Sequence, residues 1–152
     1  MADSDVVTYW RASASQTAQD DLDGLLNFVL PVAEELLGKH AEFYPFGAAV
    51  SNDGEASLAG ADPGLGEHPA SDAVLAALYQ GARMSSTSVR AAAFVVDVIV
   101  EGSDAVRVEL EHREGIALVV LAPYKRRRFK RAVTFGQMSV SSGDPRVWAA
   151  SD

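Results

Sequence analysis

Two segments of the chain are apolar on both faces of any strand they could form. Residues 91–100, AAAFVVDVIV, and residues 116–122, IALVVLA, hold almost only alanine, branched aliphatic residues and one phenylalanine. Such residues favour strands, and a strand that is apolar on both sides must be covered on both faces of its sheet. The sequence therefore predicts a sheet between two layers. These are either two helices on opposite faces, or a helix on one face and a second copy of the protein on the other.

Two other segments have the spacing of amphipathic helices. The first runs from Thr17 to Leu37, with Ser15 or Thr17 as its cap, and it contains Pro31. A proline inside a helix removes one hydrogen bond, so we expect a kink there or two shorter helices. The second runs from about Pro69 to Met84. Its apolar stripe, at helical spacing, consists of Val74, Leu75, Leu78 and Ala82.

The remaining strands are predicted from turns and alternation. Phe43–Val50 and Glu55–Ala59 flank an Asn-Asp-Gly turn, and Pro45 indicates that the first of them lies at a sheet edge or bends. Residues 106–112 alternate strictly between apolar and charged positions. In the last strand, about residues 132–140, the apolar parity changes across Gly136, which suggests a β-bulge.

The predicted order of elements is α-β-β-α-β-β-β-β. Short turns between the later strands favour antiparallel pairing of neighbours. We therefore expect an α+β fold: a single antiparallel sheet of five to six strands with two main helices. Residues 1–14 are predicted to be a flexible N-terminal arm, residues 15–142 a single domain, and residues 143–152 a C-terminal tail.

Composition limits the classes of site. The 152 residues include no cysteine, which excludes disulfides, thiolate metal sites and a cysteine nucleophile. The first residues lack the pattern of a signal peptide, and no segment has the length and hydrophobicity to span a membrane. We therefore expect a cytoplasmic protein without membrane contact, and we expect neither a cofactor nor a metal site.

Charge is distributed unevenly along the chain. The net charge is −8, but residues 1–72 carry −11 and residues 125–152 carry +5. Six of the seven basic residues of this last segment lie in YKRRRFKR, residues 124–131. This block predicts a surface that contacts an acidic partner, which could be the acidic part of another copy. The predicted contact residues of the block are Tyr124, Arg126, Arg127, Arg128 and Phe129.

Two other interpretations of the basic block stay open. Arginine forks and a stacking aromatic could bind nucleic acid through residues 125–131, although the acidic remainder of the chain would repel a long polyanion. The block could also be a solvated loop without a partner. A second candidate contact surface is the aromatic segment EFYPFG, with Phe43, Tyr44 and Phe46, which could equally be a strand packed on the core.

Candidate catalytic residues are few. Asp97 interrupts an apolar strand, and a buried carboxyl group can serve as an acid or base, unless it pairs with an arginine such as Arg107. His68 precedes a proline in a glycine-rich loop that could border a pocket. His112 shares a face with apolar residues and is expected to be a core histidine. Glu109 and Glu111 alternate with arginines, which indicates a solvated, charged face.

Several short motifs together resemble a set of small bacterial proteins of uncharacterised function. They are EFYPFGAAVSNDGE, EHPAS, LEHREG and APYKRR, and the similarity extends from about Leu25 to Gly136. The order of elements also loosely resembles roadblock and profilin-like domains. Neither resemblance implies an activity, a cofactor or a catalytic residue.

The sequence favours a non-enzymatic protein-interaction module that forms a homodimer or binds another protein. One subtype is an immunity-like inhibitor, whose acidic surface would neutralise a basic toxin. The alternatives are a small enzyme or ligand-binding protein that uses Asp97 or His68, and a nucleic-acid-binding protein that uses the basic block.

Overall fold

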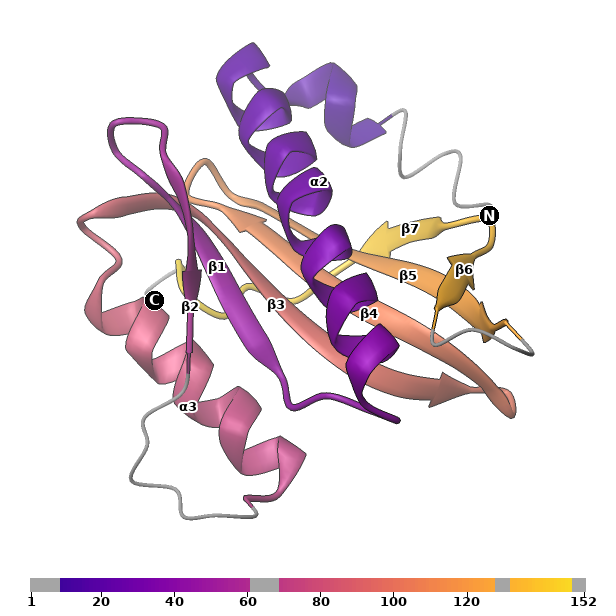
Figure 1. Ribbon diagram of the computed structural model, residues 1–152. Helices are drawn as coiled ribbons and strands as arrows, with labels where there is room; N and C mark the ends of the chain where they lie inside the picture. The colour runs from indigo at the N-terminus through magenta and orange to yellow at the C-terminus, as the bar shows by residue number, and fades with distance from the viewer. Residues whose placement is uncertain (1–8, 61–68, 128–131, 149–152) are drawn as a thin grey trace.

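The computed structural model describes residues 9–60, 69–127 and 132–148, and it confirms the α+β fold. Seven strands form one antiparallel sheet in the order β2-β1-β3-β4-β5-β6, with β7 also paired to β5 (Figure 1). The elements are α2 (Gln16–Lys39), β1 (Phe46–Ser51), β2 (Ala56–Ala59), α3 (Ser71–Met84), β3 (Val89–Val100), β4 (Ser103–His112), β5 (Ile116–Arg126), β6 (Val133–Phe135) and β7 (Ser139–Ser142).

The two helices lie on opposite faces of the sheet, which is the first of the two predicted arrangements (Figure 1). Helix α2 packs on one face through Leu22, Leu25 and Val29, which join Val95 and Val108 of the sheet in the larger core. Helix α3 covers the other face with a smaller core of Val74, Leu78, Ala92 and Phe94. Alternate residues of β3 therefore enter different cores, which explains why this strand is apolar on both sides.

Helix α2 is one continuous helix, so of the two alternatives predicted at Pro31 the pair of shorter helices was wrong, and a kink stays a prediction. Ser15 caps it by accepting a hydrogen bond from the backbone N–H of Ala18, as expected of a serine at this position. Pro31 lies between Val29 and Ala33, both fully buried. The missing N–H removes only one hydrogen bond from the helix, and burial of the neighbouring side chains holds the chain in helical form.

Strand β1 is an inner strand, because it pairs with β2 on one side and β3 on the other. The prediction that Pro45 places the first strand at a sheet edge was therefore wrong. Strand β1 begins at Phe46, one residue after the proline, so Pro45 takes no part in the ladder. The edge is formed by β2 instead.

At the opposite edge, the single last strand of the prediction is divided into β6 and β7. On β5 the paired positions Tyr124 and Leu121 are three residues apart, whereas their partners Phe135 and Ser139 are four apart. One extra residue is thus inserted near Gly136, where the parity of the sequence changed. The backbone N–H of Gly136 donates to the carbonyl oxygen of Pro123 at 2.7 Å.

Residues near both chain ends also pack on the domain. Residues 9–13 are helical, and Trp10 belongs to the larger core with 7 % of its surface exposed. At the other end, Val147 and Trp148 pack against the smaller core beside α3. Parts of the predicted arm and of the predicted tail therefore contribute to the packed structure. No helix within the described residues is both long and apolar enough to cross a membrane.

Candidate functional site

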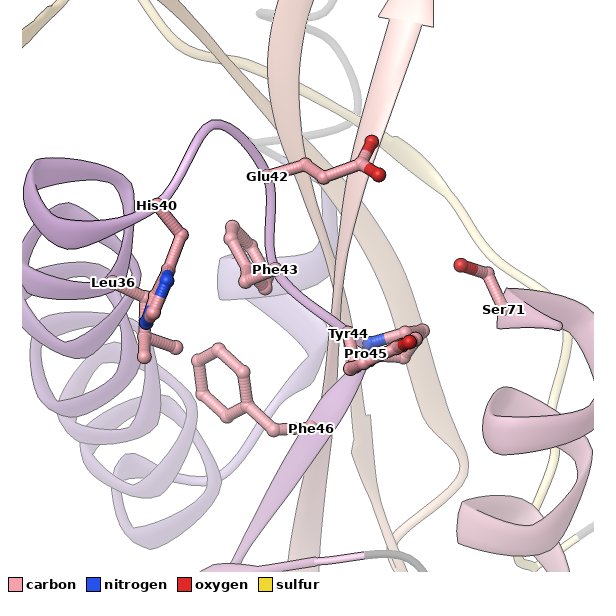
Figure 2. A pocket seen from close by; sticks show the side chains of 8 residues that line it. All are labelled: Leu36, His40, Glu42, Phe43, Tyr44, Pro45, Phe46 and Ser71. Atoms are coloured by element: carbon pink, nitrogen blue, oxygen red, sulfur yellow. The ribbon is translucent and has the colours of Figure 1, made fainter. Parts of the chain in front are cut away.

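A cleft of about 510 Å³ opens at one end of the sheet, between the last turn of α2 and the first turn of α3 (Figure 2). Most of its lining comes from the segment that joins α2 to β1. The lining residues are Leu36, His40, Glu42, Phe43, Tyr44, Pro45, Phe46 and Ser71. All three residues of the predicted aromatic contact surface are among them.

The three aromatic residues have different roles in this cleft. Phe43 is 8 % exposed and belongs to the larger core, and its ring centroid lies 5.6 Å from that of Phe46. Tyr44 keeps 49 % of its surface exposed. The two phenylalanines therefore build an apolar wall, and Tyr44 is the aromatic side chain that is free to meet another molecule.

Arg126 fixes the end of α2 and the start of the segment that joins α2 to β1. Its guanidinium group donates hydrogen bonds to the carbonyl oxygens of Leu37 (2.8 Å), His40 (3.1 Å) and Ala41. The last carbonyl groups of a helix have no partner within the helix, and an arginine fork satisfies several of them at once. Arg126, predicted as a partner contact, thus caps α2 within its own chain.

Asp97 lies on the face of the sheet that carries α2. Its Oδ1 accepts a hydrogen bond from the hydroxyl group of Tyr124 at 2.7 Å. Burial raises the pKa of Asp97 above its ordinary value, and the negative charges of Asp104 and Glu42 raise it further, against the opposing effects of Tyr124 and the Phe43 backbone.

The predicted pairing of Asp97 with Arg107 was wrong. Asp97 is opposite Val106 in the β3–β4 ladder, so Arg107 points to the other face of the sheet. There the Nη2 atom of Arg107 lies 2.9 Å from the Oε2 atom of Glu109. The carboxyl group of Asp97 therefore has a neutral hydroxyl partner in place of a cation, which agrees with a raised pKa.

Most described residues of the predicted basic surface also have partners within the chain. Tyr124 is 5 % exposed and belongs to the larger core, so its ring is not a surface group. Arg127 donates to the hydroxyl oxygen of Thr134 at 3.1 Å. Arg128 and Phe129 lie outside the described residues. Binding of nucleic acid or of an acidic protein by this block stays a prediction.

Of the histidines, His68 was the candidate site residue, and it lies outside the described residues. His112 is 2 % exposed, with its Nε2 atom 3.0 Å from Oδ2 of Asp21, and its Nδ1 atom accepts the backbone N–H of Glu114. These two contacts assign a neutral ring with its proton on Nε2. His112 is thus the predicted core histidine, with both ring nitrogens satisfied.

Asp21 is the buried carboxylate that sequence reasoning missed on this face. It pairs with Arg90 through two hydrogen bonds of 2.8 and 2.9 Å. Burial raises the pKa of Asp21, but the hydrogen bonds from Arg90 and His112 outweigh it and hold the pKa below its ordinary value. Asp21 lies on α2 close to two other acids, Asp20 and Asp23, and nothing in the pattern of the sequence distinguished it from them.

The expectation of a solvated face around Glu109 and Glu111 was wrong. These side chains are 6 % and 4 % exposed, because the C-terminal residues 146–148 cover them. Glu111 accepts four hydrogen bonds of 2.7 to 3.2 Å from the backbone N–H groups of these residues. The tyrosine hydroxyl of Tyr79 donates to Glu109 at 2.6 Å. The apolar pair Val147 and Trp148 was the sequence signal that this segment would pack.

In the described ranges, no three histidine or acidic side chains come together in a way that could hold a metal ion. Asp97 is not among the residues that line the cleft. What the cleft offers chemically is an apolar wall, an exposed tyrosine ring and a carboxylate at the rim. No family model, curated protein sequence or solved structure compared with the chain matches it.

Proposed function

We propose that the protein is a non-enzymatic interaction module that binds a basic segment of another protein at the aromatic cleft. The observation that carries the proposal is the position of Tyr44, half-exposed in a cleft whose rim also bears Glu42. An exposed tyrosine in an apolar depression is the kind of anchor that dominates many protein interfaces.

Charge supports a basic partner. Residues 1–72 carry a net charge of −11, and the carboxyl groups of Glu42 and Asp104 lie near enough to Asp97 to raise its pKa. An arginine or lysine entering the cleft would meet the carboxyl group of Glu42 and could also stack on the Tyr44 ring. The long-range field would in addition speed the association of a basic protein.

The partner chemistry is therefore a cationic side chain next to an apolar or aromatic one. The immunity-like subtype, in which the partner is a basic toxin, has this chemistry. Self-association has it as well, because the block at residues 124–131 joins arginines and lysines to a tyrosine and a phenylalanine. We favour a separate basic partner, because Tyr124 and Arg126 are engaged within their own chain.

The test uses a labelled peptide with the alternating sequence Gly-Arg-Leu-Arg-Trp-Arg-Gly, and a matched peptide with glutamate in place of arginine. We expect the basic peptide alone to bind, more weakly as salt rises. Tyr44→Ala should weaken binding by about tenfold. Glu42→Gln should weaken it several-fold and make it less dependent on salt, measured by fluorescence anisotropy.

Matched controls lie in the turn after β1 and on β2, outside the lining of the cleft. Glu55→Gln removes an exposed acid, and Leu58→Ala removes an apolar side chain that is 52 % exposed. Equal loss of binding in the control variants would show attraction to the whole acidic surface and would contradict the cleft. Sedimentation of the protein alone tests whether it associates with itself. If the protein forms a dimer, and Tyr44→Ala makes it monomeric, the partner is a second copy.

A further inference from the structure

Among the described residues, strand β2 forms one edge of the sheet and is exposed along its whole length. Within the described part of the chain it pairs only with β1, and all four of its residues, Ala56–Ala59, are exposed. The strand contains no charge, no proline and no bulge, so its shortness is its main protection. Proteins commonly block such edges, because the free backbone groups pair readily with another chain.

At the opposite edge of the same sheet, β6 and β7 are as short as β2, but the extra residue near Gly136 separates them, so that edge is not one continuous strand.

A cavity of about 240 Å³ lies beside β2, between the strand and helix α3. Figure 1 shows β2 at the edge of the sheet with α3 next to it. The cavity is bordered by small residues of β1, β2 and α3 and by the residue after α3, among them Ala49, Ser57, Ala59, Ala77, Gly81 and Ser85. A Cβ atom built on Gly81 meets no atom within 4 Å, so the space in front of this helix position is open.

Register connects the edge to the cavity. Ser57 is opposite Ala49, and Ala59 is opposite Gly47; these β1 residues are in turn opposite Ala92 and Phe94 in β3, which belong to the α3 core. Ser57 and Ala59 therefore point to the α3 side of the sheet. A strand added outside β2 would place every second side chain on this same side, next to the cavity.

We propose that β2 and α3 form a strand-addition site for an extended segment of another protein. The backbone of that segment pairs with the free edge of β2, and alternate side chains enter the cavity. The cavity lining contains no charged residue, and its volume suits one or two small side chains, so the segment carries alanine, valine or threonine at alternate positions. This inference does not depend on the aromatic cleft, with which the cavity shares no lining residue.

The probe is a labelled peptide, Lys-Thr-Val-Thr-Val-Thr-Val-Lys, and its matched control has N-methyl groups on alternate backbone nitrogens. We expect the unmodified peptide to bind and to shift the amide NMR signals of Ala56–Ala59. Gly81→Leu places a side chain in the cavity, and leucine also favours the helical conformation of α3. The variant should bind the peptide about tenfold more weakly, because the peptide side chain loses its site.

The control variant is Gly24→Leu, which adds the same side chain to an exposed glycine of α2 that also has no atom within 4 Å of its Cβ position. It should leave binding unchanged. Ser57→Lys provides a second disrupting change, on the strand itself. The proposal is overturned if the N-methylated peptide binds equally well, or if Gly81→Leu and Ser57→Lys leave binding unchanged. It is also overturned if β2 pairs with β2 of a second copy and the peptide does not compete.

Discussion

The side chain of Tyr124 on β5 reaches over β4 and donates its hydroxyl hydrogen bond to Asp97 on β3. The contact joins two strands that are not neighbours in the sheet. It also explains two features of the sequence at once: a carboxyl group inside an apolar strand, and a tyrosine at the start of a basic block. Each of the two residues therefore has a structural partner in the other.

We expect the stability of the protein to fall as pH rises through the titration of Asp97. Its pKa in the folded protein is raised, so the folded state holds the proton more tightly than the unfolded chain, whose aspartates titrate near 4. Asp97→Asn removes the charge and keeps an oxygen for Tyr124. The variant should lose less stability than the wild type between about pH 4 and the folded pKa, measured by urea unfolding.

Tyr124→Phe tests the same contact from the donor side. At pH 7 it should lower the free energy of unfolding by about 1–2 kcal/mol, because the ionised carboxyl group loses its donor, with a smaller loss at pH 4. An equal loss at both pH values would mean that ring packing, and not the hydrogen bond, decides the effect.

Arg126→Ala should destabilise the protein by about 1–2 kcal/mol, because three carbonyl groups at the end of α2 lose their donor. Arg126→Lys keeps the charge but not the fork, and should recover only part of the loss. The neighbouring Arg127→Ala should change stability by less than about 0.5 kcal/mol. Thermal unfolding of the three variants compares them, and similar effects for Arg126 and Arg127 would contradict the cap.

The ion pair of Asp21 with Arg90 should stabilise the protein above about pH 4 and should be lost as pH falls below it. The pKa of Asp21 is lowered in the folded state, so the unfolded chain takes up the proton first and acid favours unfolding. Asp21→Asn should lower the free energy of unfolding by about 2–3 kcal/mol at neutral pH. The stability of the variant should then fall less steeply than that of the wild type as the pH is lowered.

The control for this pair is on the same helix. Asp23→Asn breaks an ion pair with Arg11 whose two side chains are 41 % and 46 % exposed, and should cost less than about 1 kcal/mol. Urea unfolding from pH 3 to 7 measures both variants. If the stability of Asp21→Asn falls with acid as steeply as that of the wild type, another carboxyl group causes the fall.

Glu111→Gln should loosen residues 146–148 and lower the free energy of unfolding by about 2–3 kcal/mol, because a charged acceptor of four backbone hydrogen bonds becomes a neutral one. Hydrogen exchange at these amides should accelerate in the variant. Glu101→Gln, at the exposed β3–β4 turn, is the control and should leave exchange unchanged. Unchanged exchange in Glu111→Gln would mean that Val147 and Trp148 hold the segment by packing alone.

Local pattern predicted the main helices and strands and the need for a cover on each face of the sheet. The helical spacing of Leu22, Leu25 and Val29 predicted α2, and the two-sided apolar character of β3 required a cover on each face. The parity change at Gly136 indicated the extra residue between β6 and β7. Each of these features depends on which side of a helix or strand a residue occupies, and a period of 3.6 or 2 residues determines that within a single segment.

The roles of the charged and aromatic side chains were decided by tertiary structure. Glu109 and Glu111 have the alternation of a solvated strand, but a segment 35 residues further along covers them. Arg126 belongs to a basic block, but it caps a helix whose carbonyl groups lie 85 or more residues away in the chain. By itself the sequence determined which residues face the same way. Only the tertiary structure decided which of them meet. Burial and pairing depend on contacts between segments that are far apart in the sequence, and the periodicity within one segment does not reveal these contacts.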